Sequence, residues 1–139
     1  MKIGLALLLL PLVAYGQLRD SETVILRADD QSIYARLFKP KPEVSKAGRH
    51  PAMVLVHGFD GVSEAREGFW ARELAKLGVA TLVVESFSSR RAAASIDNQS
   101  RVSTTQGVRD AYAALGYLAQ QPYVDSARIG IMGMSRGGS

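Results

Sequence analysis

The feature that most constrains the fold is an alternation of apolar and amphipathic segments from residue 52 onward. Three apolar segments, 52–56, 79–84 and 128–133, have the composition of strands that are buried on both faces of a sheet. Between them, segments 64–77 and 106–120 repeat apolar residues at the spacing of helices. Strands and helices that alternate with short connections require right-handed parallel crossovers. We therefore predict an α/β fold with a sheet covered on both faces.

Two further strands are predicted before this unit. Residues 22–27 form a β-branched run, and residues 32–39 partly alternate apolar and polar side chains, with turn residues between the two segments. We expect an antiparallel hairpin at the edge of the sheet. The segment 39–51 is polar and punctuated by prolines, which is typical of a loop. His50 lies in this segment and is expected to be solvated.

The N-terminus has the order of a secretory signal peptide. A lysine precedes the apolar run 3–13, and the triplet 14–16 has small residues at its first and third places. We predict that residues 1–16 are a signal peptide and that the mature chain, residues 17–139, forms a single domain. A retained membrane anchor is the alternative, although the run is short for a bilayer. A secreted chain without cysteine favours the bacterial periplasm.

Composition excludes several function classes. The absence of cysteine excludes disulfide scaffolds, thiolate metal sites and cysteine nucleophiles, and two histidines are too few for a histidine-rich metal centre. The formal net charge is +4, but the basic residues are scattered among acidic ones and form no stripe with interleaved aromatic residues. We expect no metal, no cofactor, no nucleic-acid partner and no stable membrane insertion after signal cleavage.

A candidate nucleophile follows the last apolar segment directly. The residues are Gly133-Met134-Ser135-Arg136-Gly137-Gly138, a G-x-S-x-G sequence. In a nucleophile elbow the serine sits in a strained turn between a strand and a helix, and the glycines leave room where a Cβ would clash. We predict that Ser135 is held above the carboxyl edge of the sheet. A glycine-rich turn with an idle serine is the alternative.

The loop after segment 52–56 supplies the other half of the predicted site. An acyl-transfer site needs two N–H donors for the developing oxyanion, one from the residue after the nucleophile and one from this loop. We predict that the amides of Arg136 and Phe59 are these donors. Gly58 and Gly61 would let the loop bend over the pocket.

Three side chains near this site have open interpretations. His57 is expected to order the loop by hydrogen bonding, with proton transfer as the alternative. The Arg136 side chain either adds a charge that favours anionic substrates or lies on a helix surface. Glu85 follows the segment 79–84 and either lines the site or pairs with Arg90 or Arg91.

With these motifs placed, the chain resembles the α/β hydrolases of the dienelactone hydrolase family, in their secreted branch with a serine nucleophile. The resemblance covers most of residues 20–139 and only the N-terminal portion of that fold, which implies that residues 17–139 form an incomplete α/β-hydrolase domain. The namesake of the family has a cysteine in the elbow where this chain has Ser135, so dienelactone is not implied as the substrate. The motifs that carry the resemblance are His57-Gly58-Phe59, Glu85-Ser86-Phe87, Arg109-Asp110-Ala111, Arg128-Ile129-Gly130 and the elbow.

The resemblance implies a serine hydrolase that acts on small carboxylic esters or lactones through an acyl-enzyme. The order of triad residues in this fold is serine, acid, histidine, which places the acid and the histidine beyond residue 139. We therefore expect an N-terminal fragment of a secreted enzyme, inactive by itself. The alternatives are a complete non-catalytic remnant that associates with a partner chain, and a carrier that binds a small ligand. The sequence does not predict the oligomeric state.

Overall fold

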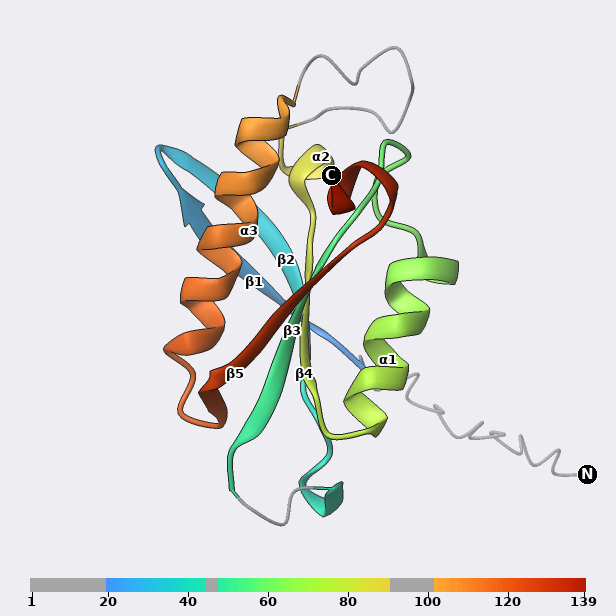
Figure 1. Cartoon of the computed structure of the whole chain (residues 1–139), viewed down its shortest axis with the longest axis vertical. Coiled ribbons are helices and arrows are strands. Elements are labelled where there is room, and N and C mark those ends of the chain that lie inside the picture. The colour runs from blue at the N-terminus through green and yellow to red at the C-terminus, as the bar shows by residue number, and fades with distance from the viewer. Residues whose placement is uncertain (1–19, 45–47, 91–101) are drawn as a thin grey trace, which may run out of the picture.

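The computed structural model describes residues 20–44, 48–90 and 102–139 (Figure 1). The predicted signal peptide, residues 1–16, lies outside the described residues, and so does Arg91. The predicted boundary at residue 17 therefore stays a prediction.

Five strands form one mixed sheet in the order β1-β2-β4-β3-β5. β1 pairs with β2 and β2 with β4 in antiparallel orientation, whereas β3 pairs with β4 and with β5 in parallel. The predicted α/β fold and the predicted N-terminal hairpin are both confirmed. The strands are β1 Glu22–Ala28, β2 Gln31–Phe38, β3 His50–Val56, β4 Ala80–Val84 and β5 Val124–Gly133.

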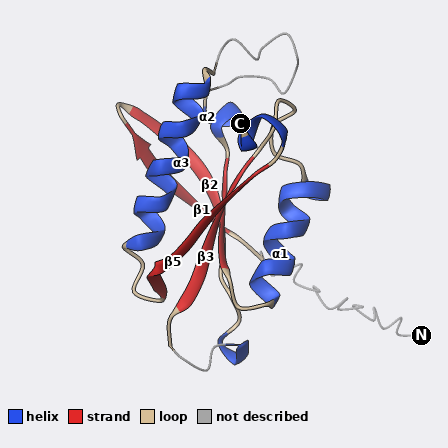
Figure 2. Cartoon of the chain, viewed as in Figure 1, coloured by secondary structure: helices blue, strands red, loops and turns tan. Residues whose placement is uncertain are grey.

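The two longer helices cover opposite faces of the sheet (Figure 2). On β3 and β4, Val54 and Leu82 pack in a core cluster with residues of α3, while their neighbours Leu55 and Val83 pack with Ala71 of α1. Adjacent residues of a strand face opposite sides, so each helix has its own apolar core. The helices are α1 Phe69–Lys76, α2 Ser86–Ser89 and α3 Thr104–Ala119, with short turns η1 Pro42–Val44, η2 Glu64–Gly68 and η4 Ser135–Gly138.

Local signals set the ends of the helices. Ser103 caps α3 in a capping box, because its hydroxyl accepts from the Gln106 amide at 3.1 Å and the Gln106 side chain accepts from the Ser103 amide at 2.8 Å. The helix therefore begins two residues before the predicted start at 106. Gly78 follows α1 at a φ of +88°, the left-handed conformation that ends many helices.

Burial differs sharply between the central strand and the last one. Every residue of β4 is buried, as predicted for a strand covered on both faces. The same prediction is wrong for β5, which lies at the edge of the described sheet and pairs only with β3. Ile131 of β5 is consequently 47% exposed.

The prediction that His50 is solvated is also wrong. β3 begins at His50, whose backbone amide donates to the Tyr123 carbonyl at 2.8 Å. The ring is buried, and its Nδ1 donates to the Gly78 carbonyl at 2.9 Å. His50 thus joins the start of β3 to the glycine that follows α1.

Candidate active site

The carboxyl ends of β3, β4 and β5 meet at one end of the sheet, near the top of Figure 1. η4, α2 and the loop after β3 all begin there. At this end, Ser135 follows β5 with a φ of +54°, in the left-handed region that side chains other than glycine avoid. Asp29, in the turn of the hairpin, is the other such residue in the described part of the chain. The serine is exposed.

The glycines on either side of Ser135 are sterically required. A Cβ on Gly133 would lie 1.9 Å from the Gly137 carbonyl oxygen, and one on Gly137 would lie 2.5 Å from the Val56 carbonyl oxygen. Both contacts are with backbone, which cannot move aside as a flexible side chain could. Gly138 is less restricted, since its Cβ would be 3.3 Å from the Gly133 oxygen. The turn therefore depends on glycine at positions 133 and 137, for the steric reason predicted.

Backbone contacts hold the elbow against β3 and the loop that follows it. The Met134 amide donates to the Val56 carbonyl at 2.9 Å, and the Gly137 amide donates to the Met134 carbonyl at 2.9 Å. A Cβ on Gly58 would lie 3.2 Å from the Cβ of Ser135, so the loop passes directly against the serine. We call residues 57–61 the oxyanion loop. Phe59 and Arg136, the predicted donors, thus belong to the two segments that flank Ser135.

The two predicted donor amides are available. Among the described residues, no hydrogen bond joins the amide of Phe59 or of Arg136 to another protein group. Both amides can therefore donate to a bound oxygen atom. The structure brings the predicted elbow and the predicted oxyanion loop together, and the assigned role of each residue stays a prediction.

His57 begins the oxyanion loop and makes contacts within it and with α2, and its role there stays a prediction. Its ring is buried and donates from Nδ1 to the Gly58 carbonyl at 2.7 Å. The same carbonyl accepts from the Gly61 amide at 3.2 Å, which closes the loop. The ring also packs edge-on against Phe87, with 4.6 Å between the ring centroids. No hydrogen bond joins His57 to Ser135 within the described residues.

An arginine that the sequence analysis did not single out supports the loop from the side of α1. Arg66 donates two hydrogen bonds to the Asp60 carboxylate, at 2.7 and 3.0 Å, and one to the Gly61 carbonyl at 3.0 Å. Its Nε donates to Glu67 at 2.7 Å. Glu67 is fully buried and accepts from the Ser63 amide at 2.8 Å. The Arg66 guanidinium holds the pKa of Asp60 below its usual value. No periodic pattern marks a contact between residues six apart, so this network had no signal in the sequence.

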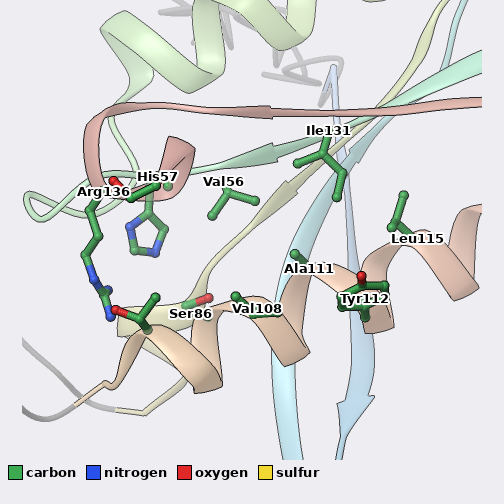
Figure 3. Close-up of a pocket in the computed structure, with 13 residues that line it drawn as sticks. Val56, His57, Ser86, Val108, Ala111, Tyr112, Leu115, Ile131 and Arg136 are labelled. Atoms are coloured by element: carbon green, nitrogen blue, oxygen red, sulfur yellow. The ribbon is translucent and has the colours of Figure 1, made fainter.

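Two depressions adjoin the elbow. A cavity of about 210 Å³ lies between the sheet, α2 and α3 (Figure 3), and its polar lining includes His57, Ser86 and Arg136. The Ser86 hydroxyl is buried and has no hydrogen-bond partner among the described residues. Ser135 lies instead in a more open depression, which it shares with Phe59, Val102 and Arg136.

The Arg136 side chain does not lie on a helix surface. Its Nη2 donates to the Val102 carbonyl at 2.6 Å. The guanidinium lies over two rings, 5.4 Å from the centroid of Phe59 and 5.6 Å from that of Phe87. The side chain lines both depressions and contacts three separate segments of the chain.

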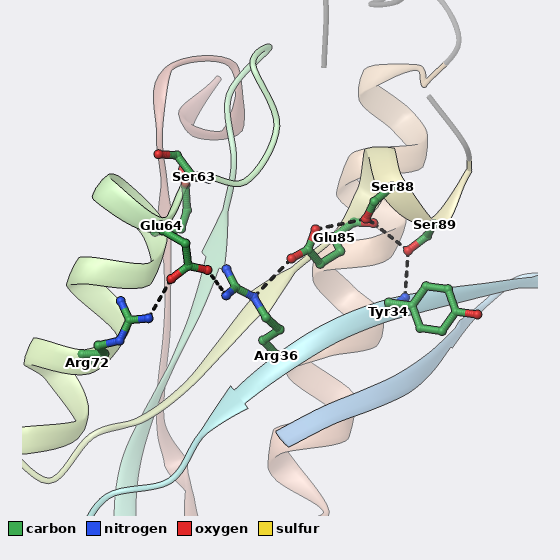
Figure 4. A network of polar contacts seen from close by, with 9 residues as sticks. Tyr34, Arg36, Ser63, Glu64, Arg72, Glu85, Ser88 and Ser89 are labelled. Atoms are coloured by element: carbon green, nitrogen blue, oxygen red, sulfur yellow. Dashed lines mark hydrogen bonds and ion pairs between the residues drawn. The ribbon is translucent and has the colours of Figure 1, made fainter. Parts of the chain in front are cut away.

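Glu85 takes part in a network of ion pairs that extends from the end of β4 to α1 (Figure 4). Its carboxylate lies 3.2 Å from Nε of Arg36 and accepts from the Ser88 hydroxyl at 3.0 Å. Arg36 also contacts Glu64, which in turn contacts Arg72.

The predicted pair of Glu85 with Arg90 is therefore wrong. β2 lies beside β4 and brings Arg36 to Glu85, whereas the turn of α2 directs Arg90 toward α3. There Arg90 donates two hydrogen bonds to the buried Asp110, at 2.6 and 2.8 Å, and the carboxylate raises the pKa of Arg90.

No group of three or more histidine, aspartate or glutamate side chains in the described part of the chain is arranged to hold a metal ion. No helix among these residues is both long and apolar enough to cross a membrane.

Comparisons with known proteins agree with this geometry. The model of the prolyl oligopeptidase family matches residues 70–139. Over 106 residues the chain is 29% identical to the uncharacterized protein YcjY of Escherichia coli, covering 76% of this chain and 34% of that protein.

Solved structures show the same fold. The structure of Est1E from Butyrivibrio proteoclasticus matches with a TM-score of 0.62 and 24% identity, covering 84% of this chain and 41% of that chain. The dienelactone hydrolase-like promiscuous phosphotriesterase P91, from metagenomic libraries, matches with a TM-score of 0.68 and 25% identity. The match covers 85% of this chain and 50% of that chain.

The chain therefore spans about a third of YcjY and up to half of these two solved structures. The expected resemblance to α/β hydrolases of the dienelactone hydrolase type, restricted to the N-terminal portion of the fold, is confirmed. Because the family model matches half of the chain and includes the elbow, the chain belongs to the prolyl oligopeptidase family of α/β hydrolases.

Proposed function

We propose that the protein containing this chain is a serine hydrolase that cleaves small carboxylic esters or lactones. The observation that carries the proposal is the exposed Ser135 at a φ of +54°, with the oxyanion loop packed against it. A strained backbone at a serine is unfavourable unless the surrounding structure maintains it, and such strain clusters at catalytic sites.

In the proposed reaction, Ser135 Oγ attacks the carbonyl carbon of the ester while a histidine accepts its proton. The amides of Phe59 and Arg136 donate to the oxyanion that forms. The C–O bond to the alcohol then breaks, and the histidine returns the proton to the departing alcohol oxygen. Water attacks the acyl-enzyme in the same way and releases the acid and Ser135.

The triad acid and histidine follow the serine in the order typical of this fold, so we propose that they lie after residue 139 in the whole protein. His57 is not the base in this proposal, because its Nε2 is buried and no hydrogen bond joins the ring to Ser135 among the described residues. The isolated segment 17–139 is accordingly expected to be inactive. We further propose that residues 1–16 direct export and that the enzyme works in the bacterial periplasm.

The family gives a second candidate activity, the cleavage of a peptide bond, since the matched model is that of prolyl oligopeptidases. The acyl-enzyme step is the same, and the two activities differ in the leaving group. Comparing a p-nitrophenyl ester with a peptide p-nitroanilide therefore decides between them.

The first experiment is mass spectrometry of the protein from its native source, to find peptides that continue past Ser139 and the mature N-terminus. We expect a start at Gln17 and, after Ser139, an acid followed by a histidine.

The native protein is then treated with a fluorophosphonate probe and assayed on p-nitrophenyl butyrate. We expect labelling and hydrolysis in the wild type and neither in Ser135→Ala. A folded native protein that the probe does not label would contradict the proposed enzyme and favour a carrier.

A further inference from the structure

We propose that the Arg136 side chain is a positioning residue that holds the oxyanion loop in its working conformation. This inference rests on the proposed function. It assigns to the side chain a task distinct from the hydrogen bond proposed for the Arg136 amide.

The side chain joins the elbow to three other segments. Its guanidinium lies over Phe59 of the oxyanion loop and over Phe87 of α2, and it donates to the carbonyl of Val102, two residues before α3. Phe87 in turn packs against the His57 ring. The loop is thus contacted by Arg136 at Phe59 directly and at His57 through Phe87.

Phe59 is a sensitive point for such a contact. Its side chain is 41% exposed, so core packing alone does not fix its position. Its amide is the proposed oxyanion donor, and the ring belongs to the same residue. A guanidinium that holds the ring therefore also limits the direction of the amide.

Arginine suits this position because its planar group can lie over aromatic faces while an N–H still donates in its plane. Lysine keeps the charge but lacks the planar fork. Methionine keeps similar length and apolar character without charge or donors. Comparing arginine, lysine and methionine at position 136 therefore distinguishes the effects of stacking, of charge and of side-chain volume.

On the opposite side, Arg66 holds Asp60 and Gly61. Loss of the Arg136 contacts would leave Phe59 free to turn, while Arg66 and the His57–Phe87 contact still hold other parts of the loop. We expect a slower chemical step with little change in ground-state binding, since the oxyanion forms only along the reaction path.

The kinetic test uses the whole native protein and the variants R136K and R136M. We expect R136M to lower kcat about 10- to 100-fold, less than or equal to the loss of one full oxyanion donor, with KM nearly unchanged. R136K should fall between R136M and the wild type. R109M is the matched control, because Arg109 is exposed on α3 and pairs only with Asp29 within the described residues. It should leave kcat unchanged.

Two further comparisons show whether the effect passes through Phe59. If it does, F59L should lower kcat in the wild type but have little further effect in R136M, a non-additivity that independent sites do not show. The loss in R136M should also be equal for neutral p-nitrophenyl butyrate and for the anionic mono-p-nitrophenyl ester of succinic acid. A loss confined to the anionic ester would overturn the proposal and make Arg136 a substrate-binding residue.

Hydrogen exchange of the loop tests the inference even if the protein proves not to be a hydrolase. The Gly61 amide, which donates to the Gly58 carbonyl, reports the closure of the loop. We expect it to exchange several-fold faster in R136M than in the wild type and in R109M. Unchanged exchange in R136M would overturn the inference. Absence of activity in a wild type with a protected loop would overturn only the proposed function.

Discussion

Among the single residues of the elbow, glycine occupies the positions where two backbone segments are in contact, so no side chain lies between them. Gly133 and Gly137 approach carbonyl oxygens more closely than any Cβ could. Ser135 keeps its side chain at a backbone conformation that glycine would adopt more easily. The crowding at Gly137 and the positive φ of Ser135 should therefore both affect the free energy of unfolding.

The first prediction concerns Gly137. In Gly137→Ala the new methyl group would meet the Val56 and His57 carbonyl oxygens, at 2.5 and 2.9 Å, so the elbow must move. We expect a loss of about 3 kcal/mol in the free energy of unfolding, measured by urea denaturation. Gly116→Ala is the matched control, since nothing lies within 4 Å of a Cβ there and the residue is inside α3. It should gain about 0.5–1 kcal/mol. Equal effects of the two alanines would contradict the steric account.

The second prediction concerns strain at Ser135. Ser135→Ala and Ser135→Gly both remove the hydroxyl, but only glycine accepts a φ of +54° without strain. We expect the free energy of unfolding of the glycine variant to be about 1 kcal/mol higher than that of the alanine variant. Neither variant should react with a fluorophosphonate. An alanine variant as stable as the glycine variant would show that the serine is not strained.

At the scale of elements, α2 is anchored to α3 by a buried ion pair. The Arg90 side chain is 9% exposed and that of Asp110 is fully buried. Arg90 also donates to the Ser86 carbonyl of its own short helix at 3.1 Å. One arginine thus fixes the element that carries both Ser86 and Phe87 beside the site.

Removal of one partner of this pair should be costly. In Asp110→Ala the guanidinium of Arg90 stays buried without its carboxylate, and we expect a loss of about 3–5 kcal/mol in unfolding free energy. Arg109→Ala, one residue away, breaks the exposed pair with Asp29 and should lose less than about 1 kcal/mol. Thermal unfolding of the two variants checks the contrast. Similar melting temperatures would show that the buried pair does not anchor α2.

The elements that could be predicted from the sequence are those with a local signal. The apolar run of β4 and the helical period of α3 each lie within one segment, and both are found where expected. The placement of β2 against β4 could not be predicted, because strand neighbours depend on contacts between distant segments. The same holds for the pair of Arg36 and Glu85 and for the Arg136 contact with Val102. The elbow was predictable because its glycines and serine are adjacent in the chain.

For the folded chain as a whole, the burial of Tyr123 makes stability depend on pH in the alkaline range. Burial raises its pKa from 10.0 to about 12, and its hydroxyl has no partner among the described residues. Above pH 10 the unfolded chain loses this proton while the folded protein keeps it. Tyr123 should therefore not lower the stability below pH 10, and should lower it progressively as the pH rises from 10 toward 12.

Tyr123→Phe removes this dependence, since phenylalanine has no proton to lose. We expect the unfolding free energy of the variant to decline less than that of the wild type between pH 10 and 12. At neutral pH its stability should be equal or higher, because an unpartnered hydroxyl is removed. Urea unfolding across this range measures both effects. Parallel pH profiles for the two proteins would contradict a buried phenol.

The strand order also sets when the molecule can fold. β4 lies between β2 and β3, although it follows both in the chain. During synthesis, β2 and β3 therefore have no pairing partner between them until residue 84 has left the ribosome, and such late, non-local pairing slows folding. The hairpin of β1 and β2 can form earlier, because its strands are adjacent in the chain, whereas the sheet becomes continuous only when β4 is inserted between β2 and β3.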